Sequence, residues 1–143
     1  MSEFIIRQYD VDDWDEVIDL WIQCGLVVPQ NDPNRDIERK LRVNPEWFLV
    51  GELEGNIVAT CMAGYEGHRG WINYLAVAPG YRRRGFAAKL IREAERILRQ
   101  AGCPKINLQI RTSNSVVIEF YKAIGYSIDD VVSMGKRLDK DGR

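Results

Sequence analysis

The stretch LAVAPGYRRRGFAAKLI, from Leu75 to Ile91, places three consecutive arginines and a glycine directly before a helix-like apolar pattern. The first turn of a helix leaves backbone N–H groups without intrahelical partners, and the helix dipole makes that end positive. A phosphate group accepts several hydrogen bonds there, and Gly85 and Ala87 keep side chains small where a ligand would meet the backbone. These residues predict a phosphate or pyrophosphate site, although a nucleic-acid patch or a basic surface turn would have the same composition.

The overall composition weighs against the nucleic-acid interpretation. The chain has 143 residues, of which 45% are hydrophobic and 29% charged, as in an ordinary globular protein. Its 20 basic and 21 acidic residues give a net charge of -1, so no general attraction to nucleic acid or to a membrane surface is expected. The length predicts a single domain over residues 1–143.

Several other classes lack their signatures. The chain contains neither G-x-x-x-x-G-K-[ST] nor G-x-G-x-x-G, the loops of nucleoside triphosphatases and dinucleotide-binding proteins. Cys24, Cys61 and Cys103 are widely spaced, so we expect buried free thiols rather than a disulfide framework or a metal site. The N-terminus lacks signal-peptide features, and no apolar run approaches the ~20 residues of a membrane span. We therefore expect a soluble, cytoplasmic protein without a metal.

The elements that must position the arginine turn follow from the hydrophobic period. Strands are predicted at 3–9, 46–53, 57–66, 71–78, 105–111 and 127–138. Helices are predicted at 10–24, 34–43 and 86–101, and a short last helix begins at Asn114 and closes on Gly125. The first helix is expected to bury one apolar stripe, composed of Trp14, Val17, Ile18, Trp21 and Ile22. The third is expected to bury another, composed of Phe86, Leu90, Ile91, Ala94, Ile97, Leu98 and Ala101.

The element order is β-α-α-β-β-β-α-β-α-β. Short turns that contain glycine or asparagine join the three central strands, which is typical of antiparallel hairpins. A helical crossover then leads to a further strand. The order therefore predicts an α/β (α+β) fold, with a central, mostly antiparallel mixed sheet flanked by helices.

Two motifs in this order resemble the GNAT superfamily of acetyl-CoA-dependent N-acetyltransferases. RRRGFA, from Arg82 to Ala87, is similar to its [RQ]-x-x-G-x-[GA] signature, and INYLAVAPGY looks like the strand that leads into it. Further on, NSVVIEFYKAIGY resembles the second motif, N-x-x-[AV]-x-x-x-Y-x-x-x-G-[FY]. The resemblance covers essentially the whole chain and is nearest to small bacterial YpeA-like members, close to the protein N-terminal acetyltransferases.

The resemblance implies a site for acetyl-CoA as co-substrate, with a primary amine of a protein, a peptide or a small molecule as acceptor. Backbone groups of Leu75, Ala76 and Val77 would align the thioester. The pyrophosphate would be surrounded by the turn and helix start, composed of Arg82, Arg83, Arg84, Gly85, Phe86, Ala87 and Ala88. Asn114 would reach the pantetheine arm, although it would also serve as a helix N-cap. Tyr121 would protonate the leaving thiolate, whereas spacing alone would suit a core aromatic.

One departure from the family pattern concerns the general base. Related bacterial N-terminal acetyltransferases carry a glutamate in the strand before the second motif, and Gln109 occupies that position here. An amide cannot hold a proton at neutral pH, so Glu66 and His68, at the predicted hairpin tip GYEGHRG, are the substitute candidates. Alternatively, an acceptor of low pKa arrives neutral, as a fraction of α-amines does near pH 7.

The sequence leaves a second function open, because a non-catalytic acetyl-CoA-binding sensor or interaction module would share the arginine turn without needing Tyr121. It does not name the amine acceptor, and homo-oligomerisation is also left open.

Overall fold

A five-stranded sheet in the order β1-β2-β3-β4-β5 forms the centre of the computed structural model, which describes residues 3–139. Adjacent strands are antiparallel from β1 to β4, and β5 is parallel to β4. The strands are β1 (Phe4–Gln8), β2 (Phe48–Leu53), β3 (Asn56–Tyr65), β4 (Gly70–Val77) and β5 (Ile106–Asn107). The helices are α1 (Trp14–Gln23), α2 (Pro33–Lys40), α3 (Phe86–Gln100) and α4 (Ser115–Ala123), with short 3-10 turns η1 (Val11–Asp13), η2 (Pro45–Trp47) and η3 (Pro79–Tyr81). The predicted mixed sheet with flanking helices is confirmed.

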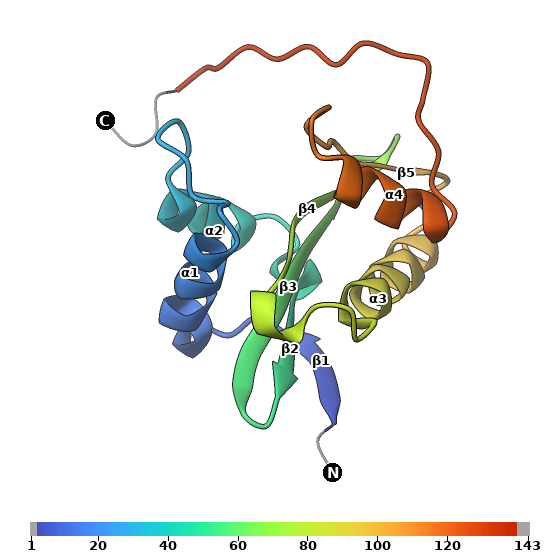
Figure 1. Cartoon of the computed structure of the whole chain (residues 1–143). Helices are drawn as coiled ribbons and strands as arrows, with labels where there is room; N and C mark the ends of the chain where they lie inside the picture. The colour runs from blue at the N-terminus through green and yellow to red at the C-terminus, as the bar shows by residue number, and fades with distance from the viewer. Residues whose placement is uncertain (1–2, 140–143) are drawn as a thin grey trace.

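Helices cover both faces of this sheet. Figure 1 shows α1 and α2 on one side and α3 on the other, with the strands between them. α4 belongs to the α3 side, because the hydroxyl of Tyr126, just after α4, donates a 2.7 Å hydrogen bond to Glu95 of α3. No helix within the described residues is long and apolar enough to cross a membrane.

The buried stripe of α1 differs from the predicted one. Val17, Leu20 and Trp21 are buried, whereas Trp14 and Ile22 are 44% and 57% exposed. Rotation of about 100° per residue puts Trp14 at the edge of the stripe of Val17, Leu20 and Trp21 and puts Ile22 well outside it. Their exposure therefore corrects the prediction that both pack in the core.

The stripe of α3 is confirmed at its centre, and it anchors the start of the helix. Phe86, Leu90, Ile91, Ala94 and Leu98 are buried, whereas Ile97 is partly buried and Ala101 is exposed. The Phe86 ring stacks on Phe4 of β1, with centroids 4.1 Å apart. Phe4 in turn lies over Gly51, where a Cβ atom would come within 2.3 Å of its ring. The absence of a side chain at Gly51 therefore allows the contact that fixes the first turn of α3.

The C-terminal part of the chain departs from the predicted strands. Only Ile106–Asn107 of the predicted strand 105–111 pairs with β4, and residues 127–138 form no strand. This last segment runs from α4 across the molecule toward the α1–α2 connection (Figure 1), where Arg137 donates a 2.8 Å hydrogen bond to Asn31. Its attachments to β5 are made by side chains, such as Asn107 to Asp129, rather than by a backbone ladder. Its apolar side chains, Ile128, Val131, Val132, Met134 and Leu138, are consequently exposed.

The thiol prediction is confirmed for one of the three cysteines. Cys61 lies in β3 and is fully buried, and burial raises the pKa of its thiol to about 12. Cys24 and Cys103 are free but only partly buried, because they follow the ends of α1 and α3 rather than a sheet face. Cys61 is therefore an inert core residue.

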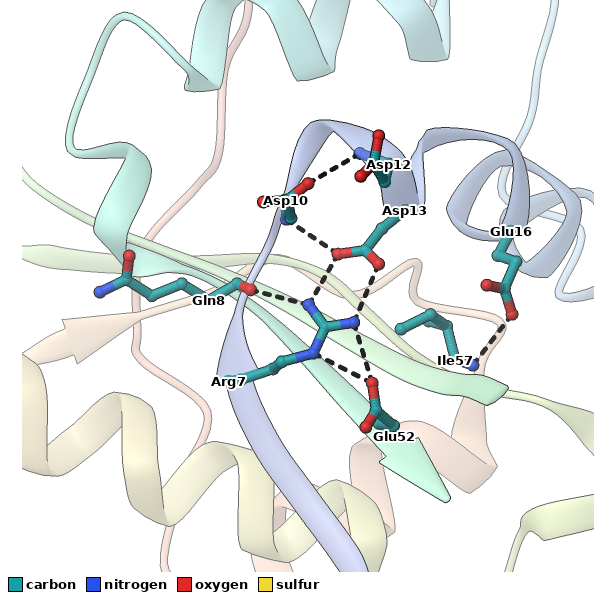
Figure 2. Close-up of polar contacts among 8 residues, drawn as sticks. All are labelled: Arg7, Gln8, Asp10, Asp12, Asp13, Glu16, Glu52 and Ile57. Atoms are coloured by element: carbon teal, nitrogen blue, oxygen red, sulfur yellow. Dashed lines mark hydrogen bonds and ion pairs between the residues drawn. The ribbon is translucent and has the colours of Figure 1, made fainter. Parts of the chain in front are cut away.

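A cluster of charges fixes the junction between β1 and α1 (Figure 2). Arg7 donates to both carboxylate oxygens of Asp13, at 2.8 and 2.9 Å, and also bonds Glu52 of β2 at 3.0 Å. Asp13 accepts a further 2.8 Å bond from the backbone N–H of Asp10. On the next helical turn, Glu16 accepts a bond from the backbone of Ile57 in β3. These bonds set where α1 begins relative to the sheet.

We predict that Asp13→Asn lowers the free energy of unfolding at pH 7 by about 1–3 kcal/mol, because the half-buried Arg7 loses a charged bidentate partner. Arg7 holds the pKa of Asp13 below its ordinary value of 3.8. The bond therefore stabilises the fold fully above about pH 4, and this stabilisation is lost as the pH falls through the lower, folded-state pKa. Urea unfolding from pH 7 downward should show the two proteins converging below pH 4.

The matched control is Glu93→Gln, which breaks the exposed pair between Glu93 and Arg96 on α3. Exposed pairs of this kind contribute about 0.2–1 kcal/mol, so the control should lose less stability than the Asp13 variant. Equal losses, or a loss at Asp13 that persists unchanged at low pH, would contradict the assignment.

Candidate functional site

The strand that leads into the arginine turn is kinked at Tyr74. Thr60 pairs with Ala76 and Met62 with Asn73, so two β4 residues oppose the single residue Cys61 of β3. This is a β-bulge, and Tyr74 adopts the left-handed backbone, with φ at 52°. An aromatic residue is rarely found in that region, which makes the kink a candidate functional feature.

A buried hydroxyl group holds the kink. The Thr60 side chain, with no exposed surface, accepts a 2.9 Å hydrogen bond from the indole of Trp21 and donates a 2.9 Å bond to the carbonyl of Tyr74. The ring of Tyr74 stacks on Trp21 with centroids 3.9 Å apart. The carbonyl that the bulge turns away from the ladder is therefore satisfied by Thr60 of β3, whose hydroxyl is itself held by Trp21 of α1.

Beyond the kink, one edge of β4 is open. The pairing between β4 and β5 covers only Gly70–Trp71 and Ile106–Asn107, so the two strands diverge after Trp71. On the other edge, Ala78 donates to Val58 of β3 at 2.8 Å. Because bonding alternates along an antiparallel pair, Ala76 directs its backbone groups to β3, whereas Leu75 and Val77 direct theirs to the open edge. Of the three predicted residues, two thus present backbone groups to the gap.

Arg82 ties the turn to the end of this strand. Its Nε donates to the carbonyl of Val77 at 2.9 Å, and Nη2 lies 3.5 Å from the sulfur of Cys24, which itself donates to the same carbonyl. The Arg82 guanidinium is thus engaged within the chain, where the sequence predicted a direct pyrophosphate contact. It connects the turn to α1.

The remainder of the turn is exposed and shaped by two left-handed residues. Arg83 has φ at 66°, and Gly85, which is the N-cap of α3, has φ at 81°. A Cβ atom at Gly85 would meet nothing within 4 Å, so glycine serves the backbone conformation and leaves open space in front of it. Arg84 lies 5.3 Å from the ring centroid of Tyr81.

The first turn of α3 carries free backbone donors. The Gly85 cap supplies no side-chain hydrogen bond, and the first described bond back to it comes from the Lys89 N–H. The N–H groups of Phe86, Ala87 and Ala88 therefore have no helical partner. Phe86 is buried, so the backbone of this turn is fixed while its donors face the open space. This arrangement fits an anionic phosphate group.

The second motif forms α4. The side chain of Asn114 accepts a 3.3 Å bond from the backbone of Val117, which confirms its role as the helix N-cap. Tyr121 is 6% exposed and contacts the rings of Phe120 and Tyr126 edge-on. Burial raises the pKa of Tyr121 above its ordinary value, so the phenol is protonated at neutral pH.

Tyr121 and Gln109 share a cavity of about 1150 Å³ between the end of α3, β5, α4 and the segment that follows α4. Asn107 and Ser133 also line it, and Ser133 contacts the side-chain amide of Gln109. The arginine turn lies outside this cavity, at the other end of α3. The two predicted motifs thus lie on the same side of the sheet, toward opposite ends of α3.

The hairpin tip between β3 and β4 is occupied by its own hydrogen bonds. The Glu66 carboxylate accepts bonds from the backbone of Arg69 and His68, at 2.5 and 2.6 Å, and from the indole of Trp71 at 3.2 Å. The backbone bonds, that of Arg69 first, lower the pKa of Glu66 and make it a weaker base. These bonds favour a structural role for Glu66 in the turn. Within residues 3–139, no three histidine, cysteine, aspartate or glutamate side chains form a group able to bind a metal.

The sequence reasoning missed the Trp21–Thr60–Tyr74 junction and the contact of Tyr74 with Asp36 of α2. One signal was present, since Thr60 is the only hydroxyl residue in the apolar run IVATCMAGY, apart from the terminal tyrosine. A buried hydroxyl in such a run needs a partner. Nothing in the sequence indicated that the partners lie on α1 and β4.

The comparisons with known proteins agree with this geometry. The acetyltransferase (GNAT) family pattern matches residues 14–126. A Yersinia pestis protein named as an N-acetyltransferase is 50% identical over 136 residues, which is 95% of this chain and 96% of that protein. An acetyltransferase of Sodalis glossinidius is 50% identical over 137 residues, with the same coverage of each chain.

Solved structures share the fold. Ard1 from Thermoplasma volcanium superposes with a TM-score of 0.75 at 22% identity, over 88% of this chain and 84% of that one. The aminoglycoside N-acetyltransferase AAC(6')-Iy in complex with coenzyme A superposes with a TM-score of 0.76 at 18% identity, over 97% of each chain.

Proposed function

Because this chain belongs to the acetyltransferase (GNAT) family and uses acetyl-CoA as its co-substrate, we propose that it transfers the acetyl group to a primary amine of low pKa. The α-amine of a peptide or protein, or a small-molecule amine, meets this description. The observation that carries the proposal is the kinked β4, whose open edge leads directly into an uncapped helix start.

The arginine turn binds the pyrophosphate of acetyl-CoA in this proposal. The N–H groups of Phe86, Ala87 and Ala88 donate to its oxygens, and Arg83 and Arg84 add positive charge from the exposed turn. Each hydrogen bond to a charged group contributes about 1.5–3 kcal/mol. Arg82 contributes indirectly, since its bond to Val77 holds the turn against the strand.

The open edge of β4 aligns the thioester. The backbone groups of Leu75 and the N–H of Val77 bond the pantetheine arm and the acetyl group, and the Leu75 N–H donates to the thioester oxygen as negative charge develops there. A preorganised donor of this kind lowers a barrier by about 3 kcal/mol. The neighbouring Tyr74 carbonyl is held by Thr60, so this N–H needs no reorganisation.

Tyr121 supplies a proton to the departing sulfur. It lines the cavity on the α4 side, and its phenol is protonated at neutral pH, because burial raises its pKa. Asn114 caps the same helix and thereby fixes its position.

The preference for an amine of low pKa follows from the state of Gln109 and Glu66, which the sequence compared with the base of related enzymes. Gln109 contacts Ser133 through its amide, and Glu66 is engaged in the hairpin turn. An α-amine with a pKa near 7.8 is about a quarter neutral at pH 7.4, whereas a lysine near 10.4 is neutral about one time in a thousand. An α-amine is therefore the better nucleophile at this site.

The first test concerns binding. Gly85→Glu should reduce coenzyme A affinity at least 100-fold in isothermal titration, because the carboxylate enters the open space before the helix and repels the pyrophosphate. The matched control is Gly102→Glu, at the opposite end of α3, where φ is 90° and a Cβ atom also meets nothing within 4 Å. It should lose comparable stability but keep its affinity within about threefold. Unchanged affinity in a folded Gly85 variant would refute the proposed phosphate site.

The second test concerns proton donation. Tyr121→Phe should lower kcat about 100-fold or more and leave acetyl-CoA affinity nearly unchanged, because the ring remains while the donor is lost. Tyr126→Phe is the matched control, since its hydroxyl bonds Glu95 and makes a structural contact. That variant should be less stable but keep kcat within a few-fold. Full activity of the Tyr121 variant in a thiol-release assay would return Tyr121 to a purely structural role.

A further inference from the structure

The open edge of β4 can be reached from both faces of the sheet, and different helices cover the two faces. The phosphate-binding turn, Asn114 and Tyr121 belong to the α3 and α4 side of the sheet (Figure 1). A nucleophile attacks a thioester carbonyl from one face of its plane. Because the bound coenzyme and Tyr121 occupy the α3 and α4 side in the proposal, the acceptor amine approaches from the side of α1 and α2.

On that opposite side, the kink in β4 places one carboxylate. The Tyr74 side chain passes over Trp21 toward α2, and its hydroxyl donates a 2.5 Å hydrogen bond to Oδ2 of Asp36. Tyr74 is the left-handed residue of the bulge, immediately before Leu75. Tyr74 thus positions two groups. Its backbone orients the Leu75 N–H that donates to the thioester oxygen, and its ring hydroxyl holds Asp36.

The surroundings of Asp36 leave it accessible. Its side chain is 24% exposed, and its second oxygen bonds Arg39 one helical turn on, in a pair where Arg39 is 48% exposed. Exposed pairs along a helix are weak and readily exchanged for another donor. Lys40, further along the helix, is bonded at 2.5 Å to the carbonyl of Ala63 in β3. An amine N–H reaches this carboxylate by displacing the exposed contact with Arg39.

We propose that Asp36, positioned by Tyr74, accepts a hydrogen bond from the acceptor amine and takes its proton during transfer. This inference rests on the function proposed above and names the missing proton acceptor. As the nitrogen bonds to the acetyl carbon, it becomes positively charged and acidic, and one N–H proton passes to Asp36. The carbon–sulfur bond then breaks, and the thiolate takes the Tyr121 proton. Solvent afterwards returns a proton to Tyr121 and removes one from Asp36.

The test uses acetyl-CoA with four amines: trialanine, Nα-acetyl-lysine amide, glucosamine and spermidine. Asp36→Asn should lower kcat/KM at least 100-fold for every amine that the wild type acetylates, with acetyl-CoA affinity unchanged. The amide oxygen can still accept a hydrogen bond from the Tyr74 hydroxyl, so the contact between β4 and α2 is retained. Asp36→Ala should recover at least tenfold in activity on addition of formate, which supplies a carboxylate in the vacated space.

Glu38→Gln removes the same charge from an exposed position of the same helix and should leave kcat/KM unaltered. If Asp36 only joins α2 to β4, its variants would lose thermal stability and formate would not restore activity. That result would overturn the inference. Normal turnover by Asp36→Asn, together with loss of coenzyme A binding in Gly85→Glu, would overturn it while leaving the proposed function intact. Failure of the wild type to acetylate any of the four amines would overturn both.

Discussion

The hydroxyl of Thr60 is the contact on which the geometry of the site depends. A bulge in a strand covered by helices turns a carbonyl away from its ladder partner, and a buried carbonyl without a hydrogen bond costs about 1–3 kcal/mol. Thr60 accepts from Trp21 and donates to the Tyr74 carbonyl, so the kink of β4 is joined to α1 and to β3 at one atom. The direction of the next N–H, that of Leu75, follows from this bond.

The two faces of the sheet then take different parts in the reaction. On one face, Gly51 makes room for Phe4, and Phe4 holds Phe86 at the start of α3, so the phosphate-binding donors are fixed by packing alone. On the other face, α1 is placed by the bonds of Arg7 and contacts the arginine turn through Cys24 and Arg82. A change in the position of α1 would therefore reach both the kink and the turn. This coupling explains why the site needs helices on both faces.

The features that the sequence could predict are those set by local chemistry. The Asn114 cap and the centre of the α3 stripe are consequences of capping chemistry and helical period, and each is found where the pattern placed it. The less predictable features depend on partners distant along the chain. Trp14 and Ile22 recur at helical spacing yet are exposed, because the buried stripe of α1 is centred on Val17, Leu20 and Trp21. The predicted strand at 127–138 meets side chains of β5 without a ladder. Glu66 had a suitable residue type, but its capture by the backbone of its own turn was not visible in the sequence.

The central claim, that the Thr60 bond directs the Leu75 N–H toward the acetyl-CoA thioester, is tested most directly by ¹⁵N–¹H NMR during an acetyl-CoA titration. In the wild type, the Leu75 amide should shift downfield and become protected from exchange, whereas the Ala76 amide, which faces β3, should change little. In Thr60→Val, with both hydrogen bonds of the hydroxyl removed, the Leu75 response should be lost even at saturating acetyl-CoA. A wild-type protein saturated with acetyl-CoA whose Leu75 amide does not move, or a Thr60→Val variant with an unaltered response, would contradict the account.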